Sequence, residues 1–146
     1  KTTEKEREQQ GAATNSEAIL KSVGKDIKMA RSASKSWEVE EGSAKIKIAY
    51  NTVNYFVAAD ACLCQMPNNG VKIKPLYQFL LEENYKLNGL VISCNGQNIV
   101  LSCILYDLDL TVEHGRAQFE KLFKTADEYD DMLKRDYECV DRLVEK

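Results

Sequence analysis

The side chains whose types and spacing could best support catalysis or metal binding in this chain are carboxylates. Asp127, Asp130 and Asp131 lie in one stretch of the last predicted helix, where Asp127 and Asp131 are four residues apart and face alike. Paired carboxylates can bind a hard cation or carry protons in acid–base catalysis. A solvated helix face produces the same spacing, with ordinary pairs such as Asp130 and Lys134. We favour the solvated face, so these residues predict no catalytic site.

Cysteine and histidine, which most often bind transition metals, are present in the wrong pattern for a metal site. The chain has five cysteines and one histidine. Cys62 and Cys64 are two residues apart in an apolar stretch, so both should point to one face of a strand. His114 falls in the first turn of the last predicted helix. Structural zinc sites need paired C-x-x-C or Cys/His sets. We therefore expect no metal and no other cofactor.

The cysteines also indicate the cellular compartment in which the chain folds. Their number is odd, the spacing of Cys62 and Cys64 is poor for a mutual disulfide, and Cys94, Cys103 and Cys139 lie in apolar or helical contexts. The simplest interpretation is five reduced, mostly buried thiols in a reducing compartment. This predicts a cytoplasmic protein.

The glycine and serine motifs of common enzyme classes are missing from the sequence. Gly42, Gly89 and Gly96 are isolated turn glycines, and neither G-x-G-x-x-G nor G-x-x-x-x-G-K-[ST] occurs. No serine lies in a G-x-S-x-G elbow. With no catalytic residue to name, we predict that the chain is not an enzyme.

Composition and charge narrow the class of partner. The chain has 146 residues, of which 44% are hydrophobic and 29% charged, as in an ordinary soluble domain. Its net charge is −3, and the one basic stripe, on the first predicted helix, is explained by a solvated face. No apolar run reaches the roughly 20 residues of a membrane-spanning helix. We therefore expect neither nucleic acid nor membrane as a partner.

The elements follow from the hydrophobic periodicity and the turn residues. Residues 1–13 are polar and predict a disordered tail, and residues 14–146 predict a single domain. The last helix could run to about 145, roughly 50 Å, so it either breaks near Asp136 or overhangs the domain. The predicted elements are a helix over about 15–31, strands at 37–40, 45–50 and 55–66, a helix over about 73–86, strands at 90–94 and 99–105, and a helix after Thr111.

This order, α-βββ-α-ββ-α, predicts an α+β fold with a mainly antiparallel sheet, because hairpins dominate and Asn95-Gly96 is a strong hairpin signal. The strand at 55–66 is apolar on both faces, which requires cover on both sides, by a helix or by a second subunit. Asp60 interrupts it and either lies on an exposed patch or pairs with Lys45 or Lys47. The residues expected in the core include Ile46, Ile48, Leu101, Phe119, Leu122 and Leu133.

Four stretches resemble the YbjN-like family of the type III secretion chaperone-like fold. They are residues 41–50 (EGSAKIKIAY), Met66-Pro67 leading into residues 80–84 (LLEEN), Asn95-Gly96 with the strand at 99–105 and Asp109-Leu110, and residues 126–133 (ADEYDDML). Together they cover about residues 16–135. Their order and spacing carry the resemblance, and such structural motifs imply a fold more directly than a function.

The resemblance implies an acidic homodimer that holds an extended segment of a client protein. It places Tyr77, Leu81 and Tyr85, on the wide apolar arc of the second helix, at a two-fold interface. It also implies a client groove from the first helix and first strands, for which we predict Ile19, Val23, Tyr50, Tyr55, Val57 and Leu63. Two alternatives stay open: that these six residues simply close the core, and that the chain is a structural or regulatory domain with no client of its own.

Overall fold

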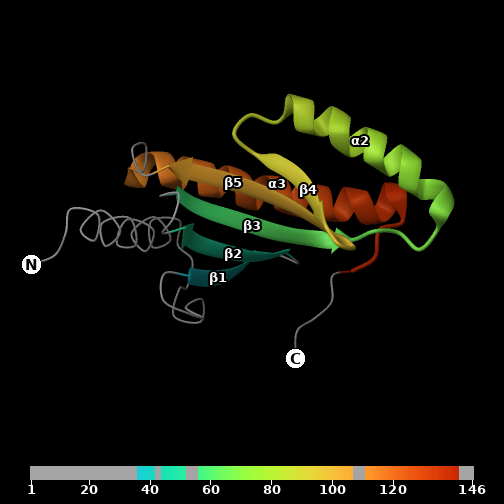
Figure 1. Ribbon diagram of the computed structural model, residues 1–146, viewed down its shortest axis with the longest axis horizontal. Coiled ribbons are helices and arrows are strands. Elements are labelled where there is room, and N and C mark those ends of the chain that lie inside the picture. Colours follow the sequence, from blue (N-terminus) through green and yellow to red (C-terminus); the bar gives the residue numbers. More distant parts are fainter. Residues whose placement is uncertain (1–35, 42–43, 52–55, 107–110, 142–146) are drawn as a thin grey trace, which may run out of the picture.

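A computed structural model of the chain describes residues 36–41, 44–51, 56–106 and 111–141 (Figure 1). The predicted tail at 1–13 and helix at 15–31 lie outside these residues. The described elements are β1 (Ser36–Glu41), β2 (Ala44–Asn51), β3 (Phe56–Gln65), the 3-10 turn η1 (Gly70–Lys72), α2 (Ile73–Lys86), β4 (Val91–Asn95), β5 (Asn98–Tyr106) and α3 (Val112–Tyr137).

The five strands form one antiparallel sheet in the order β1-β2-β3-β5-β4. β4 and β5 are joined by a tight hairpin in which Gly96 has a φ of 61°, the conformation that favours glycine. The predicted α+β class and antiparallel sheet are confirmed, and the order of elements agrees wherever the chain is described. β1 and β4 are the two edge strands of this sheet.

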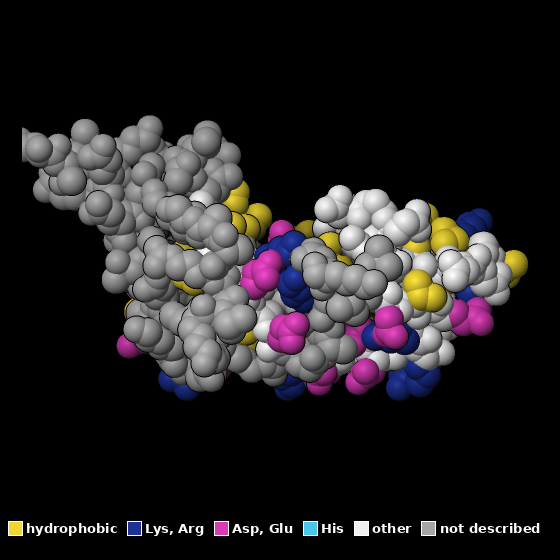
Figure 2. Space-filling model, turned by 90° about the horizontal axis from the view of Figure 1, so that it is seen from below, with side chains coloured by type: hydrophobic (Ala, Val, Ile, Leu, Met, Phe, Trp, Pro, Cys, Tyr) yellow, Lys and Arg dark blue, Asp and Glu magenta, His cyan; other side chains and the backbone are white. Residues whose placement is uncertain are grey.

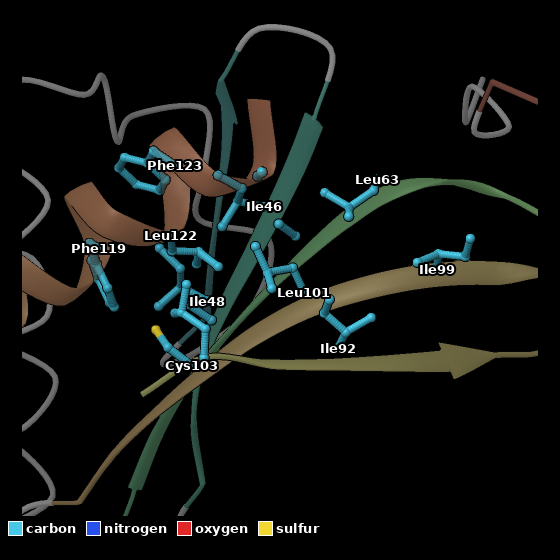
Figure 3. Packing of buried hydrophobic residues seen from close by; sticks show 14 of the residues in the cluster. Ile46, Ile48, Leu63, Ile92, Ile99, Leu101, Cys103, Phe119, Leu122 and Phe123 are labelled. Atoms are coloured by element: carbon cyan, nitrogen blue, oxygen red, sulfur yellow. The ribbon is translucent and has the colours of Figure 1, made fainter. Parts of the chain in front are cut away.

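The core lies between the sheet and α3, which runs along one face of it (Figure 1). Phe119, Leu122 and Phe123 of α3 are buried, and the Leu122 side chain extends toward Ile48 of β2 (Figure 3). All six residues predicted to be buried are at most 1% exposed. Apolar area removed from water here is the main stabilising term of the fold.

At the end of β3, buried and exposed side chains no longer alternate. Its core face carries Val57, Ala59 and Ala61, but the register with β5 shifts between Cys62 and Cys64, so that Leu63 and Cys64 are both fully buried. Cys62 stays on the other face and is partly exposed. The expectation that Cys62 and Cys64 share a face is therefore wrong, because a β-bulge adds one residue and turns the following side chain to the opposite face.

α2 covers its predicted range and is fixed by a few specific contacts. Leu76 and Leu80 are buried, while the opposite side of the helix faces outward. Asn84 Oδ1 accepts a hydrogen bond of 3.0 Å from the backbone N–H of Ile92, which joins the helix to β4. Gly89, with a φ of 84°, makes the turn between them, and Lys121 of α3 donates to the carbonyl of Asn88.

α3 begins and ends as its sequence indicates. Thr111 caps it, its hydroxyl oxygen accepting a 3.1 Å hydrogen bond from the backbone N–H of His114. The helix ends at Tyr137, and Glu138 takes a left-handed conformation with a φ of 59°. Of the two alternatives for the long last helix, the break near Asp136 is therefore correct. Neither helix in the described part of the chain is long and apolar enough to span a membrane.

Candidate protein-binding surfaces

The six residues predicted for the client groove fall into two groups, three that are buried and three that lie outside the described residues. Tyr50, Val57 and Leu63 are 6%, 1% and 0% exposed and lie in the core cluster with the side chains of α3. These three close the core, which is the alternative that the sequence left open, because they lie on the face of the sheet that α3 covers. Ile19, Val23 and Tyr55 lie outside the described residues.

The residues predicted for a dimer interface lie together on the outward side of α2. Tyr77, Leu81 and Tyr85 follow one another at four-residue spacing and are 48%, 71% and 93% exposed. We call these three residues the α2 patch. Large apolar and aromatic side chains gathered on one exposed face are typical of surfaces that bind another protein.

Beside the α2 patch lies a cavity of about 270 Å³ between α2 and β4. Its lining is mostly apolar and combines helix residues with the exposed end of the edge strand. Sequence reasoning found its helix side but not its strand side, although the alternation over residues 90–94 was the available signal. The lining residues are Tyr77, Leu80, Leu81, Asn84, Ile92, Ser93 and Cys94.

Two side-chain contacts join α2 to α3. The rings of Phe79 and Tyr137 stack with centroids 5.1 Å apart, and the Tyr129 hydroxyl donates a 3.3 Å hydrogen bond to Glu83 Oε1. Burial, followed by the charge of Glu83, raises the pKa of Tyr129 to about 12. These contacts fix the helix that carries the α2 patch.

A second apolar surface lies on the face of the sheet away from α3. Phe56 and Tyr106 are paired across β3 and β5 and make an edge-to-face contact with centroids 5.9 Å apart. Ile104 lies opposite Ala58 in the same register, and Ile104 and Tyr106 are 47% and 56% exposed. We call Phe56, Ala58, Ile104 and Tyr106 the outer-face patch. The sequence indicated an apolar second face of β3 but not that β5 would extend it.

Charged side chains of both signs lie on the part of the surface that the structure describes. Asp60 is exposed, which is one of the two predicted alternatives, and it lies opposite Lys47 in the register of β2 and β3. On the face seen in Figure 2, acidic and basic side chains are interspersed over the described surface. Nucleic-acid interfaces instead present a continuous basic surface.

Asp130 contradicts the prediction of a solvated carboxylate stretch. Its side chain is 1% exposed, and Lys134 Nζ lies 3.0 Å from its Oδ1. Lys134 also pairs with the exposed Asp141. Burial lowers the pKa of Lys134, but the hydrogen bonds that its ammonium group donates to Asp141 and Asp130 outweigh burial, and the pKa is raised overall. Asp127 and Asp131 are exposed, as predicted. Among the described residues, no three potential ligand side chains come together as a metal site would require.

The arrangement of the fold can be compared with known proteins. No protein-family model and no curated protein sequence matches this chain. Solved structures do match it. A chain of the ExsC–ExsE complex has a TM-score of 0.65 at 12% identity, over 86% of this chain and 95% of that chain.

Two further structures agree. YbjN from E. coli has a TM-score of 0.58 at 10% identity, over 86% of this chain and 93% of that chain. The Yersinia pestis type III secretion chaperone SycH, solved with a fragment of YscM2, has a TM-score of 0.58 at 13% identity, over 84% of this chain and 98% of that chain. At such identities the likeness concerns the fold, and the chain has the type III secretion chaperone-like fold that YbjN shares.

Proposed function

We propose that this chain is a non-enzymatic protein-binding module that holds a segment of a client protein. The observation that carries the proposal is the fold: the ExsC–ExsE and SycH–YscM2 structures are both complexes of a protein of this fold with another protein. Fold alone does not determine function, so the proposal also depends on surfaces that this chain offers to a partner.

Two kinds of surface support the proposal. The outer-face patch and the α2 patch expose apolar side chains that would gain from burial against a partner. The edge strands β1 and β4 can accept an extended peptide as an added strand, with backbone hydrogen bonds for affinity and side-chain pockets for specificity. Within this proposal, client contact by Ile19, Val23 and Tyr55 remains a prediction.

We also propose that two copies of the chain associate through the α2 patch. Tyr77, Leu81 and Tyr85 project from one helix face, and the α2–β4 cavity beside them can receive the same side chains of a second copy. A two-fold interface places each patch against its own symmetry mate, which suits a self-complementary apolar surface. The expected complex is a cytoplasmic homodimer that binds one client.

The experiment that tests the client proposal compares binding with folding. Tagged wild-type chain is used as bait in the cell that produces it, beside the variant Val23→Asp. If Val23 contacts the client, the variant loses the captured partner while its melting temperature stays within about 2 °C of wild type. If Val23→Asp and Tyr55→Ser both unfold the domain, these residues belong to the core and the groove assignment is wrong.

The alternative function is a structural or regulatory domain with no client. The same experiment separates the two, because such a domain copurifies with no partner whose binding depends on the outer-face patch or on Val23. The fully folded wild-type chain would then be recovered alone or only as copies of itself.

A further inference from the structure

The segment after α3 returns to the sheet and pairs with the end of β3. The backbone N–H of Gln65 donates to the carbonyl of Val140 over 2.8 Å, and the N–H of Val140 donates back to the carbonyl of Gln65 over 3.1 Å. Asn69 Nδ2 donates to Glu138 Oε2 over 3.3 Å, which joins the segment to the loop before α2. We call residues 138–141 the C-terminal segment.

Two cysteines meet under this bridge. Cys64 precedes Gln65 and Cys139 precedes Val140, so both side chains lie on the side of the bridge opposite to Gln65 and Val140. Cys64 is fully buried and Cys139 is 6% exposed, and both are free thiols. The Cys64 thiol donates a hydrogen bond to the Cys139 sulfur. The bulge in β3 is what turns Cys64 to this face.

The contact makes the two thiols chemically different. The hydrogen bond to Cys139, together with burial, raises the pKa of Cys64. The same hydrogen bond lowers the pKa of Cys139, because a donated proton stabilises its thiolate. The thiolate is the form that attacks an oxidant. Cys139 keeps 6% of its surface exposed and Cys64 none, so an oxidant reaches Cys139 first.

We propose that Cys64 and Cys139 are an oxidisable pair, in which a peroxide forms a disulfide that fastens the C-terminal segment to β3. The Cys139 thiolate attacks a peroxide oxygen, the O–O bond breaks, and with one proton the products are a sulfenic acid on Cys139 and water. The Cys64 thiol then attacks that sulfur, the S–O bond breaks, and the hydroxyl leaves as water with the Cys64 proton. Two electrons pass from the two sulfur atoms to the peroxide.

The disulfide would close a loop of about 75 residues, which restricts the unfolded chain strongly. It also fixes the end of α3, where Tyr137 stacks on Phe79 of α2. Oxidation therefore holds α2 and the C-terminal segment together at one end of the sheet. In a reducing compartment such a disulfide is transient and reports oxidative conditions.

Peptide mapping of the folded chain tests the proposal. Purified reduced protein is treated with hydrogen peroxide in about twofold excess, the remaining thiols are alkylated, and the peptides are mapped without reductant. The expected result is one dominant cross-linked peptide pair, Cys64 with Cys139, and a melting temperature raised on the order of 10 °C. Dithiothreitol should reverse both changes.

Matched variants identify the pair. Cys139→Ser should abolish the cross-link and the rise in melting temperature, while Cys94→Ser, at an exposed cysteine outside the pair, should leave both unchanged. Protein oxidised in 8 M urea gives the distribution of an unfolded chain with five thiols. The proposal is overturned if the folded protein gives that same mixture, or if Cys94 is oxidised while Cys64 and Cys139 both remain as thiols.

Discussion

Asp130 is the residue at which the sequence interpretation and the structure differ most. The apolar stripe of α3 runs through Phe119, Leu122, Ala126 and Leu133, and Asp130 falls on the same stripe, four residues after Ala126. That position was visible in the sequence. It was interpreted as solvated because carboxylates are rarely buried unless they are paired, and Lys134 supplies the pair.

Removal of Lys134 should therefore destabilise the fold. In Lys134→Met the buried carboxylate of Asp130 loses its counter-ion, and we expect the free energy of unfolding to fall by about 2 kcal/mol, less than for a pair buried at both ends. Urea unfolding at pH 7 measures the loss. Arg135→Met is the matched control, because Arg135 pairs with Asp136 at the exposed surface and its loss should leave the free energy of unfolding close to that of the wild-type chain. Equal effects of the two variants would contradict the account.

Tyr129 gives a prediction in pH. Its pKa is raised to about 12 in the folded chain, above its ordinary value of 10.0, so folding favours the protonated phenol. The contribution of Tyr129 to stability is then fully present below pH 10 and is lost as the pH rises through 12. In ¹³C spectra of labelled tyrosine, the midpoint of the Tyr129 signal should lie above the ordinary pKa of 10.0. Glu83→Gln should bring the Tyr129 pKa down, and an unchanged pKa would show that Glu83 does not raise it.

At the scale of the elements, the turn between α2 and β4 depends on one glycine. Gly89 has a φ of 84°, and a Cβ there would lie 3.0 Å from Gln118 Oε1. Gly89→Ala should lower stability by about 1 kcal/mol or more, since alanine is strained at positive φ. Gly70→Ala is the control, because a Cβ at Gly70 meets nothing within 4 Å and its φ is not positive. Thermal melting of both variants checks the difference, and equal melting temperatures would refute the strain.

The α2 patch makes a prediction about assembly. Leu81→Asp should convert the proposed dimer to a monomer at tens of micromolar, because a charge in an apolar two-fold interface is buried twice. The core of the Leu81→Asp monomer should stay intact, since the Leu81 side chain is 71% exposed. Lys124→Asp introduces the same side chain at an exposed position of α3 and should leave the mass by light scattering unchanged. A wild-type monomer would contradict the dimer proposal.

The elements were also the level at which sequence reasoning worked best. Hydrophobic periodicity and the Asn95-Gly96 turn located α2 and the β4–β5 hairpin closely, because those signals are local. The bulge after Cys62 and the burial of Tyr50, Val57 and Leu63 were not predictable in the same way. Both depend on which strand pairs with β3 and on which face α3 covers, and these are properties of the tertiary structure.

At the scale of the whole molecule, sequence and structure agree on the fold and leave the partner to experiment. The resemblance carried by residues 41–50, 80–84 and 126–133 led to the same fold that the solved structures share. Tyr77, Leu81 and Tyr85 were singled out because their helix is apolar over a wide arc, and their place at a two-fold interface, which the resemblance implies, stays a prediction. The strand side of the cavity and the outer-face patch were missed because each combines residues far apart in the sequence.

The central claim is that the folded chain holds a segment of another protein, and native mass spectrometry tests it most directly. The tagged chain, expressed at its natural level, is isolated from the cell that produces it and weighed without denaturation. The account predicts a complex of two copies of the chain with one copy of a second protein. The variant Ile104→Asp, in the outer-face patch, should lose that second protein while the chain stays folded and dimeric. Recovery of the folded wild-type chain with no second protein bound would contradict the account.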